Sequence, residues 1–370
     1  MEKVLVTGGA GFIGSHLIDE LTRRSYRVKS FDVYDRQVHK RAKPAYMNKK
    51  CEYVRGDVRD KRALRKALAG ADIIFHFAAQ VGVGQSMYKI HRYVDHNTCG
   101  TANLLDIIVN NKLNPRKVIV ASSMSIYGEG EYVCPRCGKV VCRVRPEAQL
   151  VKRDWEMRCP RCGAHVKALP TPESKGLIAT SVYGITKKDQ EELCLVVGKS
   201  YQIPTVALRF FNVYGPRQSL SNPYTGVCAI FSSTIKNDCP PIVYEDGNQT
   251  RDFVHVRDIV QANIIAMEKK EADYEFFNVG CGRPVSVLEI AHILITLYGK
   301  KMEPMIANKF RAGDIRHCFA DISKITKLGY KPSVSLETGL RELVAWGKKE
   351  KAANLIKKAD AELDTMGLKI

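Results

Sequence analysis

Tyr183 and Lys187 stand four positions apart in a stretch that we expect to be helical. At this spacing their side chains share one face of the helix. An ammonium group beside a phenol lowers the pKa of the phenol and favours the phenolate. A phenolate can remove the proton of a sugar hydroxyl while a hydride leaves the same carbon. The pair therefore indicates oxidation of an alcohol, although a Tyr and a Lys at this spacing also occur by chance on many helix surfaces.

A serine-rich strand end precedes that pair in the chain. The apolar residues 118–122 predict a buried strand, and Ser123 follows at its carboxyl end. A hydroxyl there can hydrogen bond the oxygen from which a neighbouring phenolate takes a proton. The chemistry that these side chains indicate is oxidation of an alcohol by a nicotinamide. The candidate catalytic residues are Ser123, Tyr183 and Lys187.

Glycines near the start of the chain predict where the nicotinamide nucleotide binds. Gly8, Gly11 and Gly14 follow the expected strand 3–7 and precede a helical pattern that begins near Ser15. Backbone amides at a helix N-terminus can hold a pyrophosphate when residues without Cβ allow close approach. The candidate residues of this loop are Gly8, Gly11, Phe12, Ile13 and Gly14.

Two acidic residues at later strand ends indicate how the nucleotide is recognised. Asp32 ends the expected strand 27–31, where a carboxylate can accept from the ribose hydroxyls and repel a 2′-phosphate. We therefore predict NAD and not NADP, although a strand-end turn also explains Asp32. Asp57, after the strand 52–55, can accept from the adenine amino group, and an Asx turn explains it almost as well. Further cofactor contacts are expected from Val58, Ala78 and Ala79.

Four of the 12 cysteines form two near-identical knuckles. Each has the sequence Cys-Pro-Arg-Cys-Gly, and 21 residues lie between Cys137 and Cys159. Two CxxC pairs at this separation suit tetrahedral zinc, and four thiolates leave no position for a catalytic water. Redox-active or accidental cysteines are the alternative. We predict a structural zinc held by Cys134, Cys137, Cys159 and Cys162.

The knuckles lie in a basic insertion, residues 130–168, in which nine Lys or Arg between 134 and 168 accompany three acidic residues. A segment this short has too little core to fold alone, so we expect metal binding to supply its folding free energy. Cys142 and His165 are second choices as ligands. Basic zinc ribbons often contact nucleic acid. The place of this one inside a catalytic domain favours a role over the sugar or at a subunit contact, and we expect no nucleic-acid partner.

The elements that position these residues form an α/β fold. Strands that alternate with helices predict a Rossmann-type doubly wound parallel sheet, with a smaller substrate-binding lobe and the inserted zinc ribbon. We expect an NAD-binding domain over 1–200, interrupted by the insertion. Residues 201–350 should form mainly the substrate-binding lobe, with room for strands or helices that return to the first domain. A terminal helix over 337–358 and a C-terminal tail over 351–370 complete the expected architecture.

Composition excludes other classes of protein. The 370 residues include 58 Lys or Arg and 39 Asp or Glu, a net charge of +19, and 45% are hydrophobic. This length fits about two lobes with a substantial core. No stretch approaches the roughly 18 uncharged apolar residues of a membrane span, and the start of the chain does not resemble a cleavable signal. We therefore expect no membrane span and a cytoplasmic location.

Taken together, these motifs resemble the extended short-chain dehydrogenase/reductase superfamily, specifically its nucleotide-sugar epimerase branch, which includes UDP-galactose 4-epimerase. The resemblance covers nearly the whole chain and continues through residues 208–217, 251–258 and 278–280. It implies that Tyr183 is the base, Lys187 its partner and Ser123 the hydroxyl donor. It also implies a cofactor contact from Asn97 and a homodimer. The implied contacts with the sugar nucleotide come from Ser123, Tyr183, Asn212, Arg251 and Arg311, and the arginine forks suit pyrophosphate oxygens.

The two residues after Ser123 indicate the reaction within this branch. Dehydratases carry Asp-Glu there, decarboxylases a Glu and 3,5-epimerases a Cys at the second position, whereas this chain has Met124 and Ser125. What remains is a 4-epimerase, in which a 4-keto sugar forms by hydride transfer to NAD and is reduced again from its other face. The cysteine-pair insertion resembles chains assigned as dTDP-L-rhamnose 4-epimerases, which predicts interconversion of dTDP-L-rhamnose and dTDP-6-deoxy-L-talose. UDP-glucose or UDP-glucuronate 4-epimerase is the alternative. An NAD-binding regulatory or nucleic-acid-associated protein is the alternative of another class.

Overall fold

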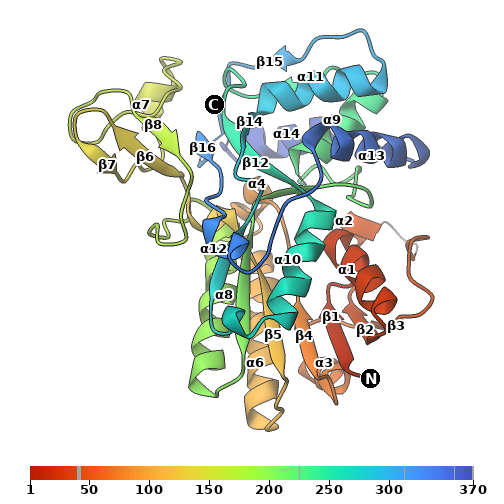
Figure 1. The fold of residues 1–370 in the computed structure, drawn as a ribbon. Coiled ribbons are helices and arrows are strands. Elements are labelled where there is room, and N and C mark those ends of the chain that lie inside the picture. The colour runs from red at the N-terminus through yellow and green to blue at the C-terminus, as the bar shows by residue number, and fades with distance from the viewer. Residues whose placement is uncertain (40–42, 225, 312, 354, 369–370) are drawn as a thin grey trace.

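A seven-stranded parallel sheet lies at the centre of the structure, a computed structural model that describes residues 1–39, 43–224, 226–311, 313–353 and 355–368 (Figure 1). Its strands are β1 (Lys3–Thr7), β2 (Arg27–Asp32), β3 (Glu52–Arg55), β4 (Ile73–His76), β5 (Lys117–Ser123), β9 (Thr205–Phe210) and β13 (Phe276–Val279). Their order across the sheet is β13-β9-β5-β4-β1-β2-β3. The predicted doubly wound sheet is confirmed.

Helices cover both faces of this sheet, so its strands are apolar on both sides. One face carries α3 (Lys61–Leu68), α6 (Gly100–Asn110) and α8 (Val182–Ser200), and the other carries α1 (Phe12–Arg23) and α10 (Val256–Glu268). In β1, Leu5 packs into the core on the first face, while Val4 and Val6 pack into the core on the second. The alternation follows from the two-residue period of a strand.

The order of the strands reverses between β1 and β4, and at such a switch point the carboxyl ends of parallel strands border a crevice. Short helical segments follow the strands at this edge. They are α2 (Arg36–His39), α4 (Val83–Ser86), α5 (Ile90–Tyr93), the π-helix η1 (Val94–Cys99) and the 3-10 helix η2 (Met124–Ile126).

A smaller lobe faces that edge. Its strands are β10 (Asn212–Tyr214), β12 (Thr250–His255), β14 (Pro284–Ser286), β16 (His317–Cys318), and the pair β11 (Ile242–Val243) and β15 (Met305–Ile306). Its helices are α9 (Val227–Lys236), α11 (Val287–Tyr298) and α13 (Leu336–Lys349), which share a core around Phe231, Leu294 and Leu343. Two short helices lie beside the main sheet: α12 (Ser323–Thr326) contacts β13, and Ala272 of η3 (Lys270–Ala272) packs into the core on one face of the sheet. Strands β9 and β13 come from residues after 200 and belong to the main sheet, where we expected mainly the substrate-binding lobe.

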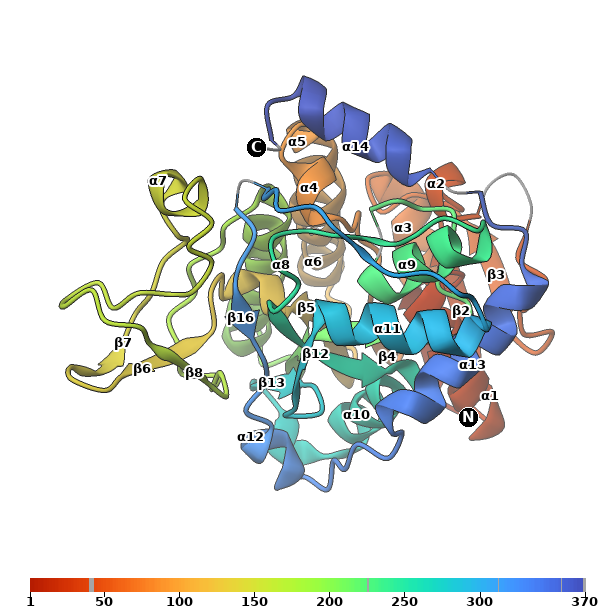
Figure 2. The ribbon, with the colours of Figure 1, turned by 90° about the horizontal axis from the view of Figure 1, so that it is seen from above.

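The insertion forms a separate three-stranded antiparallel sheet. Its elements are β6 (Glu131–Cys134), β7 (Gly138–Val140), α7 (Glu147–Leu150) and β8 (Lys167–Leu169), with β6 in the centre. Figures 1 and 2 show this ribbon projecting from one side of the molecule. We call residues 130–169 the ribbon.

The C-terminal prediction was wrong. The expected helix over 337–358 is broken, because α13 ends at Lys349 and a second helix, α14 (Ile356–Thr365), follows where a tail was expected. Ala359 and Leu363 are four positions apart and both are buried against the body of the protein. Among the described residues, the helices include none with the length and apolarity needed to cross a membrane.

Candidate active site

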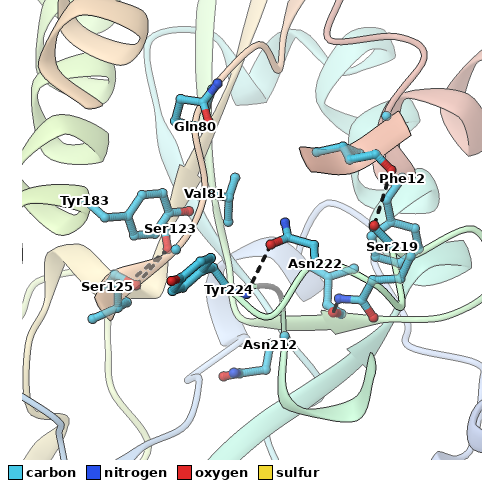
Figure 3. Close-up of a pocket in the computed structure, with 18 of the residues that line it drawn as sticks. Phe12, Gln80, Val81, Ser123, Ser125, Tyr183, Asn212, Ser219, Asn222 and Tyr224 are labelled. Carbon is cyan, nitrogen blue, oxygen red and sulfur yellow. Dashed lines mark hydrogen bonds between the residues drawn. The ribbon is translucent and has the colours of Figure 1, made fainter. Parts of the chain in front are cut away.

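A cavity of about 600 Å³ lies between the carboxyl edge of the main sheet and the smaller lobe. Figure 3 shows Tyr183, Ser123 and Ser125 gathered on one side of it, and Phe12 and Ser219 on the opposite side. Most of the residues that the sequence analysis selected line this one cavity. They are Gly8, Gly11, Phe12, Ile13, Gly14, Asp32, Asp57, Val58, Ala78, Ala79, Ser123, Tyr183, Lys187, Asn212, Arg251 and Arg311.

Two elements bring the tyrosine and the serine together. Ser123 is the last residue of β5, and Tyr183 is the second residue of α8. The side chain of Ser181 caps α8 by accepting from the backbone N–H of Gly184 at 3.0 Å. Gly184 also permits close packing, because a Cβ at this position would lie 2.6 Å from the carbonyl oxygen of Ser125. The Tyr183 ring consequently lies beside the Ser123 side chain (Figure 3), whose Oγ donates to Ser125 Oγ at 3.2 Å.

Burial controls the protonation of the tyrosine and the lysine. It raises the pKa of Tyr183 to about 12, against the hydrogen bond with Ser123, which lowers it. Burial also lowers the pKa of Lys187 to about 7, and the Lys187 Nζ donates to Gln190 Oε1 at 2.8 Å. The expectation that the ammonium lowers the pKa of the phenol was therefore wrong for this state of the protein. Without further charge in the cavity, the phenol is neutral at pH 7.

The glycine loop is shaped to lie against a nucleotide. Gly8 has a φ of +72°, and a Cβ there would lie 2.9 Å from the backbone nitrogen of Ala78. The carboxylate of Asp32 accepts from the N–H groups of Ala10 at 3.0 Å and Tyr34 at 2.8 Å, which holds it beside the loop. The start of α1 therefore presents backbone amides to the cavity next to a carboxylate, a set of groups that fits a dinucleotide with free ribose hydroxyls.

Two predicted cofactor residues have other partners. Asp57 lines the cavity, and its carboxylate also accepts from the Arg59 Nε at 3.0 and 3.1 Å. Asn97 is fully buried behind the cavity wall instead of lining it. Its side chain accepts from the N–H of Gln80 at 2.7 Å and donates to Thr186 Oγ1 at 3.0 Å. Asn97 thus joins the loop after β4 to α8, and its contact with a cofactor stays a prediction.

The opposite wall of the cavity carries positive charge. The Arg251 guanidinium donates to the carbonyl oxygens of Ile315 at 2.7 Å and Arg316 at 2.9 Å. Arg311 stacks on the ring of Tyr244, 4.6 Å from its centroid, and its Nε donates to Asp314 Oδ2 at 2.8 Å. These contacts fix two cations on one wall, as the binding of a diphosphate requires.

Asn212 and Gln249 present polar atoms to the same cavity. The Oδ1 of Asn212 and the Oε1 of Gln249 are buried and have no hydrogen-bond partner among the described residues. A buried acceptor without a donor is costly, and a bound polar ligand would remove that cost.

Part of the lining of the cavity comes from residues that no sequence motif indicates. Gln80, Asn222, Tyr224, Tyr244 and Gln249 line the cavity, but no motif marks them. The α14 residues Ala359, Asp360 and Leu363 line it as well. The apolar spacing of Ala359 and Leu363 was the available signal for a packed helix at the C-terminus.

The four cysteines of the knuckles come together in the ribbon. The Sγ atoms of Cys134, Cys137, Cys159 and Cys162 all lie within 4.8 Å of one another, and those of Cys134 and Cys162 are 3.5 Å apart. Tetrahedral zinc with Zn–S distances of about 2.3 Å requires S···S separations of about 3.8 Å, so the cluster fits the metal. Against the effect of burial, the backbone N–H groups of Arg136 and Cys137 help to lower the pKa of Cys134 to about 7. The second-choice ligand Cys142 lies in the ribbon core, outside the cluster.

Comparison with known proteins agrees with this geometry. The sequence pattern of the NAD dependent epimerase/dehydratase family matches residues 4–146 and 166–280. The dTDP-L-rhamnose 4-epimerase of Burkholderia thailandensis is 36% identical over 353 residues, which cover 93% of this chain and 94% of the relative. A putative UDP-glucose 4-epimerase of Methanocaldococcus jannaschii is 33% identical over 347 residues, with 93% and 98% covered. The crystal structure of the UDP-glucuronic acid 4-epimerase of Bacillus cereus in complex with UDP-glucuronic acid and NAD has a TM-score of 0.77 at 30% identity, and the match covers 94% of this chain and 99% of that one. The chain therefore belongs to the NAD dependent epimerase/dehydratase family, in its nucleotide-sugar epimerase branch.

Proposed function

We propose that this NAD-dependent nucleotide-sugar epimerase inverts C4 of the hexose, and that its substrate pair is dTDP-L-rhamnose and dTDP-6-deoxy-L-talose. One observation carries the proposal. The neighbouring side chains of Ser123 and Tyr183 (Figure 3) lie in the same cavity as the glycine loop and the wall that carries Arg251 and Arg311, which we call the arginine wall. Such a cavity can hold a dinucleotide and a sugar diphosphate with a proton-transfer group between them.

The residues proposed to hold NAD are those of the glycine loop with Asp32, Asp57, Val58, Ala78, Ala79 and Lys187. Bound there, NAD would accept the hydride from C4 and return it, and its positively charged nicotinamide ring would favour the phenolate of Tyr183. Asp32 contributes selectivity, because its carboxylate would repel the 2′-phosphate of NADP.

The side chains of the protein supply the proton chemistry. The Tyr183 oxygen removes the proton of the C4 hydroxyl and later returns it, while Ser123 hydrogen bonds the same sugar oxygen. Lys187 lies one turn further along α8 and is the proposed partner of Tyr183. Its Nζ is oriented by a hydrogen bond to Gln190. Met124 and Ser125 also line the cavity, and methionine cannot transfer a proton. The site therefore lacks the additional acid and base at these positions that elimination of water needs.

The arginine wall can hold the nucleotide end of the substrate while the hexose rotates within the site. Arg251 and Arg311 are proposed to hold the diphosphate, with Asn212 as a further polar contact. Firm binding of the nucleotide end leaves the hexose free to present either face of its C4 to the cofactor. Most of the binding energy should therefore come from the nucleotide diphosphate and not from the sugar.

The substrate is the finer part of the proposal. The Burkholderia relative and the cysteine-pair insertion favour dTDP-L-rhamnose. The Methanocaldococcus and Bacillus relatives favour UDP-glucose or UDP-glucuronate as the second candidate. We also propose that Cys134, Cys137, Cys159 and Cys162 bind a structural zinc, because four thiolates complete its coordination.

Incubation of the purified protein with each candidate sugar nucleotide tests the proposed function. NMR of the sugar H4 signal should show conversion of dTDP-L-rhamnose to its C4 epimer, with a kcat/KM at least about tenfold above that for UDP-glucose or UDP-glucuronate. Faster conversion of a UDP-sugar would contradict the proposed substrate but would still support the proposed inversion at C4. No inversion of C4 in any of them, with NAD added, would overturn the proposed reaction.

A further inference from the structure

The residues 310–317, which we call the arginine segment, connect the ribbon to the cavity. Arg311 belongs to this segment, and the carbonyl oxygens of Ile315 and Arg316 orient the guanidinium of Arg251. Both arginines of the cavity wall therefore depend on the position of this one segment. Ala312 lies outside the described residues.

Arg145 of the ribbon reaches into the body of the protein beside this segment. Its guanidinium forms a bidentate ion pair with Glu245, at 2.7 and 2.9 Å, and donates to the carbonyl oxygens of Trp155 at 2.8 Å and Asp314 at 3.4 Å. The side chains of Arg145 and Glu245 are 1% and 3% exposed. Glu245 also borders the cavity, next to the Tyr244 ring that supports Arg311.

Arg316 of the arginine segment extends this ion-pair network. Its side chain is fully buried, and its Nη1 donates to Glu245 at 2.9 Å and to Asp246 at 2.7 Å. Its Nη2 donates to Glu156 of the ribbon at 2.5 Å. The carboxylate of Glu245 is thus shared between an arginine from the ribbon and an arginine from the segment.

Other contacts hold the two ends of the arginine segment. At one end, the ring of Phe310 packs against Trp155 of the ribbon, with centroids 6.4 Å apart. At the other end, the backbone N–H of Arg316 donates at 2.7 Å to the buried carboxylate of Glu129, which also accepts from the hydroxyl of Tyr132 at 2.7 Å. Tyr132 lies on β6, two residues before the cluster cysteine Cys134.

A buried ion-pair network holds one geometry only while all its members are present, because a buried charge that loses its partner is strongly destabilising. The ribbon contributes Arg145 and Glu156 to this network. Its own core is small and includes cysteines of the metal cluster. The arrangement of the cysteines therefore determines where Arg145 lies, and Arg145 in turn helps to place the arginine segment.

We propose that the ribbon is a positioning module for the nucleotide end of the substrate site, with Arg145 as its principal positioning residue. Arg145 does not line the cavity. It acts through Glu245 and the arginine segment on Arg251 and Arg311. This inference rests on the proposed function for the identity of the ligand, a nucleoside diphosphate group.

The variant Arg145→Met tests this inference, and Arg143→Met is its matched control because Arg143 is an exposed arginine of the same ribbon. Calorimetry measures the Kd for dTDP, UDP and NAD, zinc is determined by elemental analysis, and kinetics separate KM from kcat. We expect R145M to raise the Kd for the preferred nucleotide and the KM for its sugar about tenfold or more. The kcat, the Kd for NAD and the zinc content should stay within about twofold of wild type. R143M should leave all of these quantities unchanged.

A second variant keeps the inference falsifiable if R145M does not fold. Glu156→Gln weakens the ion pair with Arg316 at a half-exposed carboxylate, and it should raise the nucleotide Kd in the same direction but less. Chelation of zinc from the wild type should likewise weaken nucleotide binding while NAD still binds. Unchanged nucleotide binding in R145M and E156Q, or an equal loss of NAD and nucleotide binding, would overturn the inference. The two proposals can fail separately. If the protein epimerises no sugar but binds dTDP or UDP in a way that depends on Arg145, the proposed function is wrong and this inference still holds.

Discussion

The main sheet and the ribbon maintain their structures in different ways. The sheet has apolar cores on both faces, and strand residues such as Val6, Ile119 and Leu208 are fully buried. The buried core of the ribbon consists of Tyr132, Val140, Cys142, Met157 and two members of the four-cysteine cluster, Cys134 and Cys159. Segments of about 40 residues or fewer usually need a metal, a disulfide or a partner to fold. The catalytic residues therefore lie on a sheet that apolar burial stabilises, whereas the small core of the ribbon is supplemented by ion pairs and, as we propose, by a bound metal.

The largest expected effect concerns the sheet edge alone. Tyr183→Phe removes the hydroxyl that transfers the proton and should lower kcat about a thousandfold. Both regions should keep their structure, so the thermal midpoint and the zinc content should not change. Tyr93→Phe is the control, because the Tyr93 ring neighbours Tyr183 at 6.4 Å but its hydroxyl makes only a 3.2 Å hydrogen bond with Gln85. Substantial epimerisation by Y183F would show that another residue, and not Tyr183, is the base.

Removal of the proposed zinc should unfold the ribbon and leave the main sheet folded. Structural zinc contributes about 10–16 kcal/mol in small zinc-binding peptides, far more than the ribbon core alone can supply. Hydrogen exchange after chelation should show lost protection at β6, β7 and β8, with β1, β4 and β5 still protected. The variant Cys162→Ser should lose zinc, and Cys99→Ser, at another exposed cysteine outside the cluster, should keep it. Equal loss of protection in both regions would show that they do not differ in this way.

A smaller effect tests the electrostatics of the sheet edge. Catalysis needs the phenolate, so kcat/KM should rise with pH as Tyr183 loses its proton. The hydrogen bond with Ser123 lowers the pKa of Tyr183 against the effect of burial, so Ser123→Ala should raise this pKa and move the rise of kcat/KM to higher pH. At neutral pH the rate should fall about tenfold. Ser125→Ala removes the acceptor of the Ser123 hydroxyl but keeps that hydroxyl beside Tyr183, and a pH profile that moves equally in both variants would contradict this role for Ser123.

Local patterns predicted much of the fold and the site. The glycine loop, the strand ends at Asp32 and Ser123, and the two cysteine knuckles are each encoded within a few residues, and the backbone places them as expected. Long-range packing explains the failures. The burial of Asn97 between Gln80 and Thr186 follows from the way α8 packs against η1, which no local pattern reveals. The pKa of Tyr183 depends on burial, which the spacing to Lys187 does not reveal.

The amino-acid sequence by itself determined the family, the strand-loop-helix that faces the dinucleotide and the four-cysteine cluster, because each depends on residues close together in the chain or on a repeated motif. Only the tertiary structure decided how the ribbon meets the active site. Arg145 and Glu245 are 100 positions apart and no motif marks either of them. Their pairing depends on how the ribbon packs against the smaller lobe, and a buried ion pair is favourable only where that packing excludes water and supplies every partner.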